Sequence, residues 1–456
     1  MKGDFSRFTF DPKKHYSRVL MQQGRVQLDA DWNEQVAILL HRLETMARDL
    51  IGPFGGPSHD CGFNIMPDHG SFTIGSGRYY VEGLLCENDS VCNYKDQPLR
   101  PEADVKLVDG KDYLVYLDAW EQYINVLEEP DLREKALGGP DTTGRSKVAW
   151  AVRTEKLTSF TGETDPERIF EWFIDHGSTG CAQVFQPPNR GWLIVKLEQT
   201  TVDNEAPCVV SPAARFRGLE NQLYRIEIHS TGFAYDPKLH KTEGSYPPAT
   251  FKWSRENGSV IFPVVSAEGR VIGLEPLGVA TTSGLKIGDW VELIDKDRTA
   301  QATTEALLQV KSVDPVKLQV TVDADVKSVD QGKHPYLRRW DQKPGPTNKG
   351  VPTMHEGAAI VFENTWLSIE DGIQIWFWHN KGTPANYYRS GDFWYIPART
   401  DNGGKLDWPD EGVPPHGVRH RYAPLAVLTF DEASPQFKLK ASFLKQFDPM
   451  SKPKTT

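Results

Sequence analysis

The feature that most limits the fold of this chain is a long succession of short, strand-like runs that begins near Cys61. Each run is rich in β-branched and aromatic residues and is bounded by turn-forming residues, which is typical of strands joined by turns. The sequence therefore predicts a mainly β fold, with several antiparallel sandwich or small-barrel modules and one N-terminal amphipathic helix. The expected strands are Ser71–Leu85, Tyr113–Trp120, Lys147–Lys156, Trp192–Val202, Leu223–His229, Trp290–Asp295, Leu307–Val313, Leu318–Val322, Ala359–Phe362, Phe393–Pro397 and Leu425–Phe430.

Two dipeptides predict tight hairpins in this β-rich region. Asn257-Gly258 and Asp371-Gly372 both favour the positive φ angles of a two-residue turn. The first lies between the apolar runs at 250–254 and 260–265, and the second between those at 366–369 and 373–377.

The length of the chain, 456 residues, exceeds what one hydrophobic core usually organises. We therefore expect several packed modules, and turn-rich stretches mark their candidate boundaries. The expected division is an N-terminal arm and helix at 1–57, β-rich modules at 58–215 and 216–335, and an aromatic-rich C-terminal β module at 336–456. Within the third of these, the pattern near 284–322 is typical of a small barrel.

The N-terminal helix has clear start and stop signals. Asp31 and Glu34 are spaced as in a capping box, and Gly52-Pro53 cannot continue a helix. The alternation of Val26 and Leu28 with polar residues predicts a short strand before it.

The apolar stripe of this helix allows two interpretations, because one amphipathic helix is not stable alone. The helix can pack on its own domain, or it can serve as an oligomerisation arm. The residues that would form the oligomer interface are Trp32, Val36, Leu39, Leu43 and Met46.

Composition excludes several classes of partner. The formal net charge of −10 opposes a nucleic-acid surface, because phosphate contacts need an excess of Lys and Arg. No run approaches the roughly 20 apolar residues of a bilayer-spanning helix, and the first residues lack a secretory apolar core. We therefore expect that the protein assembles in the cytoplasm and does not insert into a membrane. The five widely spaced cysteines are typical of free thiols and not of a zinc site.

Motifs that suggest catalysis lack the context that catalysis needs. Gly139–Ser146 has phosphate-loop spacing, but it has Arg in place of Lys and is not flanked by a strand and a helix in the required order. His416 and His420 are four residues apart, but the prolines before them oppose a helix, so hydrogen-bonded loop histidines are expected. We predict a protein that is not an enzyme and that holds no cofactor or metal.

Carboxylate pairs leave one catalytic alternative open. Glu128-Glu129, Asp203 with Glu205, and Glu370-Asp371 are interpreted most simply as surface or turn residues. With 62 acidic residues in the chain, a pair at glycosidase spacing is not excluded.

Aromatic residues concentrate in the C-terminal part of the chain and have two interpretations. If exposed, they can stack on sugar rings and form a glycan-binding platform. If inward-facing, they fill the core between two sheets. The candidate stacking residues are Trp376, Trp378, Tyr388 and Trp394.

Several sequence blocks resemble a bacterial family of obscure function that is encoded in contractile-injection-system and phage-tail-like gene clusters. The block from Gly24 to Gln35 is also similar to a strand-helix segment of phage tail-fibre and baseplate proteins, in which the helix helps identical subunits assemble. The blocks that carry the family resemblance are Met1–Arg7, Met21–Gln35, Asp49–Pro57, Tyr113–Trp120, Ala136–Asp141, Phe251–Val260, Gly391–Arg399 and Arg421–Leu425.

The resemblance implies a structural part of a phage-tail-like particle, in the baseplate periphery, a fibre, a cage or a cap. Its expected partners are other particle proteins and further copies of itself, as a trimer or hexamer, and its final location is the particle. The alternative is a module of the particle that binds a glycan or the cell envelope, with or without glycosidase activity. The family supplies no catalytic residues.

Overall fold

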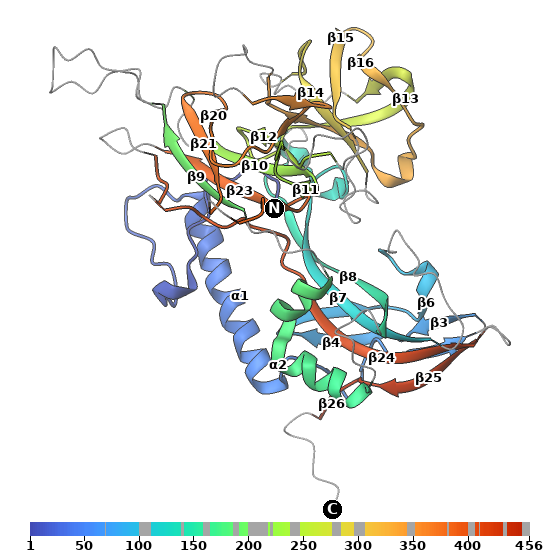
Figure 1. Cartoon of the computed structure of the whole chain (residues 1–456). Helices are drawn as coiled ribbons and strands as arrows, with labels where there is room; N and C mark the ends of the chain where they lie inside the picture. Colours follow the sequence, from blue (N-terminus) through green and yellow to red (C-terminus); the bar gives the residue numbers. More distant parts are fainter. Residues whose placement is uncertain are drawn as a thin grey trace, which may run out of the picture. The chain divides into compact units, whose positions relative to one another are not determined.

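The computed structural model confirms a mainly β fold with several antiparallel sheets (Figure 1). Two α-helices occur among the described residues, and neither is long and apolar enough to cross a membrane. The structure describes residues 1–68, 70–99, 111–137, 141–157, 165–185, 191–198, 218, 222–237, 247–275, 284–295, 306–343, 352–380, 383–399, 406–409, 411–431 and 436–448.

The chain forms two compact units, and each is assembled from three separate segments. Unit 1 contains residues 1–8, 123–145 and 188–417, and unit 2 contains residues 9–122, 146–187 and 418–456. This division differs from the four consecutive modules expected from the sequence. Turn-rich stretches marked gaps between elements, whereas the units are defined by pairing between strands that are distant in the sequence.

Unit 2 holds both α-helices and three sheets, with strand orders β26-β1-β4-β5, β2-β3-β6 and β25-β24-β7-β8. Aromatic and aliphatic side chains from all three sheets and from α2 share one core. The elements are η1 (Pro12–Lys14), α1 (Asp29–Ile51), β1 (Phe54–Pro57), β2 (Ile65–Asp68), β3 (Ser71–Ile74), β4 (Gly77–Val81), β5 (Leu84–Asn88), β6 (Cys92–Asn93), η2 (Tyr94–Asp96), β7 (Asp112–Ile124), β8 (Arg145–Lys156), α2 (Pro166–Phe185), β24 (Arg421–Asp431), β25 (Gln436–Ser442) and β26 (Gln446–Phe447).

The second helix, α2, corrects the expectation of a single N-terminal helix. Its Ile169, Phe173 and Cys181 are buried against unit 2. At Gly177 the backbone leaves helical geometry, with φ 55°, and the freed N–H of Ser178 donates to the Glu82 carboxylate at 2.8 Å. Because glycine disfavours the interior of a helix, Gly177 interrupts the helical pattern of the sequence, and the helix was not predicted.

Unit 1 contains a sandwich, a barrel and a small two-stranded sheet. The five-stranded sheet β18-β19-β12-β10-β23 and the three-stranded sheet β20-β21-β9 share one aromatic and aliphatic core. The elements are η3 (Pro130–Leu132), η4 (Lys135–Leu137), β9 (Trp192–Leu197), β10 (Gln222–Ser230), β11 (Gly232–Phe233), β12 (Thr250–Ser254), β13 (Ile261–Leu274), β14 (Trp290–Ile294), β15 (Leu308–Asp314), β16 (Gln319–Val326), η8 (Gln331–Lys333), β17 (Tyr336–Trp340), β18 (Met354–His355), β19 (Ala358–Ile360), β20 (Trp366–Ser368), β21 (Ile373–Trp378), β22 (Tyr387–Tyr388) and β23 (Phe393–Ala398).

The barrel is present and closed, with strand order β13-β16-β15-β14-β17. It extends beyond the region near 284–322 that the sequence indicated. The long strand β13 supplies one wall and pairs with both β16 and β17, so the ring closes only with residues from 261 to 340.

One of the two expected hairpins forms. Asp371 and Gly372 adopt φ 53° and 81° and join the paired strands β20 and β21. Asn257 and Gly258 also adopt positive φ, but the strands they join do not pair with each other. Strand β12 pairs with β10 and β19, and β13 enters the barrel. The prediction of this hairpin was wrong because the turn links two sheets.

Candidate functional site

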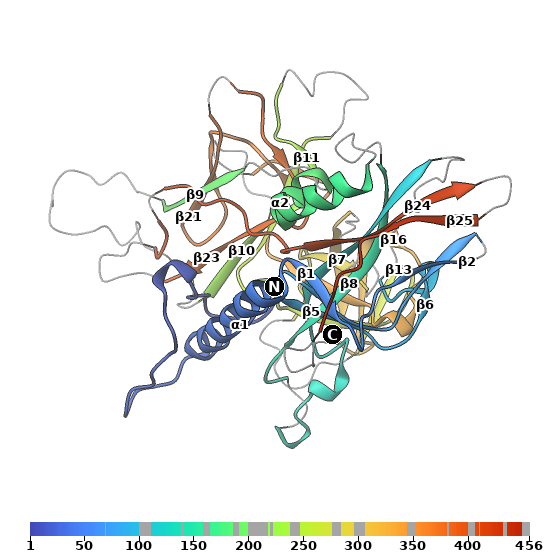
Figure 2. The same ribbon diagram turned by 90° about the horizontal axis from the view of Figure 1, so that it is seen from below.

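Helix α1 is a single helix of 23 residues in unit 2, and residues 9–28 of the same unit run beside its first turns (Figures 1 and 2). It begins three residues before the expected start, because the N-cap residue is Leu28 and not Asp31. Asp31 therefore occupies the third helical position, where its carboxylate accepts from the backbone N–H of Leu28. Glu34 accepts instead from the Thr9 hydroxyl, which ties the N-terminal segment to the helix. The predicted stop is confirmed, because Gly52 has φ 96° and donates to the Arg48 carbonyl.

One side of α1 is attached to the body of unit 2. Ala30 and Ile38 are buried, and the Glu44 carboxylate lies 2.6 Å from Arg421 of β24. The turn between β4 and β5 touches the helix backbone at Gly83, which has φ 82°. A Cβ atom there would lie 2.2 Å from the Glu44 carbonyl oxygen, so this contact requires glycine.

Gly83→Ala should lower the stability of the protein by at least about 2 kcal/mol, because the new methyl group clashes with α1 and the left-handed backbone is strained. Urea unfolding with two-state analysis measures the loss. Gly24→Ala is the matched control in the same unit, because Gly24 has φ 69° but open space around it. An equal loss in both variants would show that strain alone matters and that the helix contact does not.

The opposite side of α1 presents apolar side chains to solvent, and we call this row the seam. Trp32 is 63% exposed, Leu43 55% and Leu50 73%. Spacings of four, three, four, three and four residues separate its members, which is the heptad pattern of a coiled-coil contact row. Five of the six are the interface residues expected from the sequence, and Leu50 extends the row. The seam consists of Trp32, Val36, Leu39, Leu43, Met46 and Leu50.

The segment before α1 adds to this apolar surface. It does not form the expected strand at Val26 and Leu28, and both side chains are exposed. Leu20 and Met21 are also exposed, while the backbone N–H of Val19 is bound by the Gln35 side chain at 2.7 Å. The segment is thus attached to α1 but buries little of its own apolar surface.

The four aromatic residues that were candidates for glycan stacking fall into two groups. Tyr388 and Trp394 are fully buried in the core of unit 1, so for these two the inward-facing interpretation holds and the stacking interpretation does not. Trp394 faces inward from β23, and Tyr388 donates from its hydroxyl to Glu363. Trp376 and Trp378 lie on the outer face of β21, where strand alternation turns them away from the core.

The histidines and carboxylates singled out in the sequence do not converge. His416 lies against the rings of Phe393 and Tyr395, and burial lowers its pKa. His420 instead contacts Asp118 through Nδ1 at 2.6 Å. Within the described ranges no group of three His, Cys, Asp or Glu residues is arranged to hold a metal ion.

The acidic pairs are likewise dispersed, and two of the sequence motifs fall partly or wholly outside the described residues. Asp203 and Glu205 lie outside them, as does part of the loop at 139–146. Burial raises the pKa of Glu370 to about 7, while its neighbour Asp371 accepts from the Tyr224 hydroxyl at 2.6 Å. Glu128 accepts from the backbone N–H of Asn125, which caps a turn.

A buried ion cluster in unit 1 was not foreseen. Glu227 of β10 binds Arg225 at 2.5 Å, Lys2 at 2.8 Å and Lys252 at 3.5 Å, and Lys252 also binds Glu292 at 2.7 Å. Burial alone would raise the pKa of Glu227, but the three cations hold it well below its ordinary value. Glu292 also lines a pocket of about 270 Å³ together with barrel residues, whereas Glu227, Arg225 and Lys252 are almost fully buried and paired with one another, so we interpret the cluster as a structural feature.

The chain was also compared with known proteins. A family model described as "Family of unknown function (DUF6519)" matches residues 1–159 and 190–427. No curated protein and no solved structure matches the chain. The matched residues include α1 with its seam and most of both units.

Proposed function

The chain belongs to the DUF6519 family, whose function is unknown, and we propose that it is a structural subunit that assembles with copies of itself through the seam of α1. The observation that carries this proposal is the exposed heptad row on an otherwise anchored helix. Full burial of one Leu or Met side chain contributes about 1.5–3 kcal/mol, so six half-exposed residues offer on the order of 5 kcal/mol for each copy.

A second copy of the same helix is the partner that suits this surface best. Heptad spacing lets a row pack against an identical row, with each side chain entering a hole between four residues of its neighbour. The seam covers fewer than three heptads, so a coiled coil of only two helices would have marginal stability. Three helices bury more of each seam, and we expect a trimer, or a hexamer that contains two trimers.

The assembly to which we assign this subunit is a phage-tail-like contractile injection particle, in the baseplate periphery, a fibre, a cage or a cap. The support for this assignment is the set of sequence blocks that resemble proteins encoded in such gene clusters. The expected partners are other particle proteins, and assembly takes place in the cytoplasm.

Two measurements test this function. Native mass spectrometry of the purified chain should give a trimer or hexamer, and a monomer at all concentrations would contradict self-assembly. Particles sedimented from the encoding bacterium should contain the chain in a fixed ratio to their sheath protein. Intact, fully active particles from a deletion strain would remove the structural role in the particle.

A further inference from the structure

The outer face of the sheet β20-β21-β9 in unit 1 carries four tryptophans. Trp366 and Trp376 lie directly opposite each other on β20 and β21, and Trp378 and Trp192 lie opposite each other on β21 and β9. Trp378 is 44% exposed and Trp192 42%. Because the alternate residues of these strands fill the sandwich core, the indoles form a row across the sheet.

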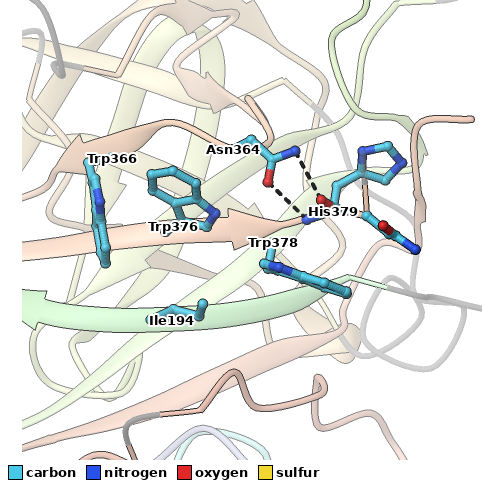
Figure 3. Close-up of a pocket in the computed structure, with 7 residues that line it drawn as sticks. Ile194, Asn364, Trp366, Trp376, Trp378 and His379 are labelled. Carbon is cyan, nitrogen blue, oxygen red and sulfur yellow. Dashed lines mark hydrogen bonds between the residues drawn. The ribbon is translucent and has the colours of Figure 1, made fainter. Parts of the chain in front are cut away.

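Three of these indoles surround an open pocket of about 500 Å³ (Figure 3). The ring centroids of Trp366 and Trp376 are 5.0 Å apart at 62°, an edge-to-face arrangement that fixes both planes. The Trp376 ring nitrogen has no hydrogen-bond acceptor among the described residues. The pocket is lined by Ile194, Asn364, Trp366, Trp376, Trp378, His379 and Asn380.

Polar groups at the rim are amides and an imidazole. The Asn364 side chain holds the backbone of His379 through two hydrogen bonds, of 3.0 and 3.2 Å, so this edge is preorganised (Figure 3). Asn380 also lines the pocket, where its side-chain amide offers a donor and an acceptor to a ligand. Lys196 lies 4.0 Å above the Trp366 ring, and behind the rim the Glu363 carboxylate lies 3.7 Å from Nδ1 of His379.

We infer that this tryptophan face binds a glycan, with pyranose rings stacked on the indoles and hydroxyls bound by the rim amides. Flat aromatic surfaces with a few placed polar groups are suited to ligands that have both apolar faces and hydroxyl edges. A quaternary ammonium ligand needs an enclosed cage and gains from a carboxylate, whereas this pocket is open, has no acidic lining residue and has Lys196 beside it. The row of four indoles suits a chain of two or more sugar units.

The face belongs to unit 1 and the seam to unit 2, so this inference does not rest on the proposed assembly. It keeps Trp376 and Trp378 from the stacking residues expected from the sequence. The buried Tyr388 and Trp394 leave the set of candidate stacking residues, and Trp366 and Trp192 of the outer face join it.

Affinity electrophoresis and isothermal titration test the inference on the full chain. The probes are peptidoglycan fragments, chitohexaose, cellohexaose and bacterial O-polysaccharides, with choline as a separate probe. At least one glycan should bind, and Trp378→Ala and Trp366→Ala should each weaken its binding about tenfold, since an aromatic contact contributes up to about one decade in affinity. Phe233→Ala is the matched control, because Phe233 is 47% exposed in the same unit but lies on β11.

Three outcomes would overturn the inference. The first is no binding to any glycan of the panel. The second is glycan binding that Trp378→Ala and Trp366→Ala leave unchanged. The third is binding of choline alone, lost in both variants, which would make the face a cation site. Thermal unfolding of each variant excludes loss of fold as the cause. Trp378→Ala, which changes an exposed residue, should unfold close to the temperature of the unchanged protein.

Discussion

Replacing both Leu39 and Leu43 by glutamate should convert the assembled protein into monomers. Each glutamate would place a charge in the centre of the helical interface, where neither residue has a partner of opposite sign in an identical helix. The two leucines are about half exposed in the single chain, so the fold of each subunit should persist. Sedimentation velocity gives the mass, and far-UV circular dichroism reports the fold.

Leu439→Glu combined with Val316→Glu provides a matched control for this double change. Leu439 is 46% exposed on β25 and Val316 is 90% exposed in the barrel turn, and neither lies on α1. This variant should keep the mass of the unchanged protein. If the seam variant also keeps that mass, the subunits contact each other through another surface and the proposal fails.

Glu227→Gln should cost about 3–5 kcal/mol of stability, the typical effect of breaking a buried ion pair. The substitution leaves Arg225 and Lys252, each almost fully buried, with one fewer negative charge to offset them. Urea unfolding at pH 7 measures the loss. The exposed Glu268→Gln should change the stability by less than about 0.5 kcal/mol.

The same cluster predicts how stability falls in acid. Although burial would raise it, the pKa of Glu292 is lowered from 4.5 to about 2 by Lys252 and Lys2. A carboxyl with a lowered folded-state pKa contributes stability that is fully present above pH 4.5 and is lost as the pH falls toward 2. Burial also lowers the pKa of His229 from 6.5 to about 4. The unfolded chain therefore binds more protons between these pH values, and the free energy of unfolding falls as the pH is lowered from 6.5 to 4.

The unchanged protein should therefore lose stability steeply below pH 4, and Glu227→Gln should lose less over the same range. Urea midpoints at pH 4, 3 and 2.5 test this, because the contribution of His229 fades as the pH falls below its folded-state pKa of about 4. Parallel curves for the two proteins would mean that Glu227 is not held ionised by the cluster.

Local patterns in the sequence identified much of the fold. Strand alternation and turn dipeptides depend on neighbours in the chain, so most strands and the Asp371-Gly372 hairpin could be predicted. The partners of a strand depend on residues far away. For that reason the sequence predicted a hairpin at the Asn257-Gly258 turn, which in fact links two sheets. It also predicted a barrel that lacks β13 and β17.

The candidate sites show the same distinction. Helical spacing alone identified the seam, because a heptad row is a property of consecutive residues. The buried charges were not predictable in this way, because Arg225 and Glu227 alternate with apolar residues as they would on an outward-facing strand surface. Similarly, Trp394 and Trp378 both look like strand aromatics, and only the packing of the second sheet decides which one is covered.

The pairing of the first and last strands of unit 2 has a consequence for synthesis of the chain. Strand β1 pairs in parallel with β26, and Ser58 donates to the Phe447 carbonyl at 2.9 Å. Arg421, which binds Glu44 of α1, also lies in the last segment. The segment from Arg421 to Phe447 must therefore be synthesised before α1 gains its full support. Chains that end before this segment lack both contacts, so α1 should be less firmly held in them.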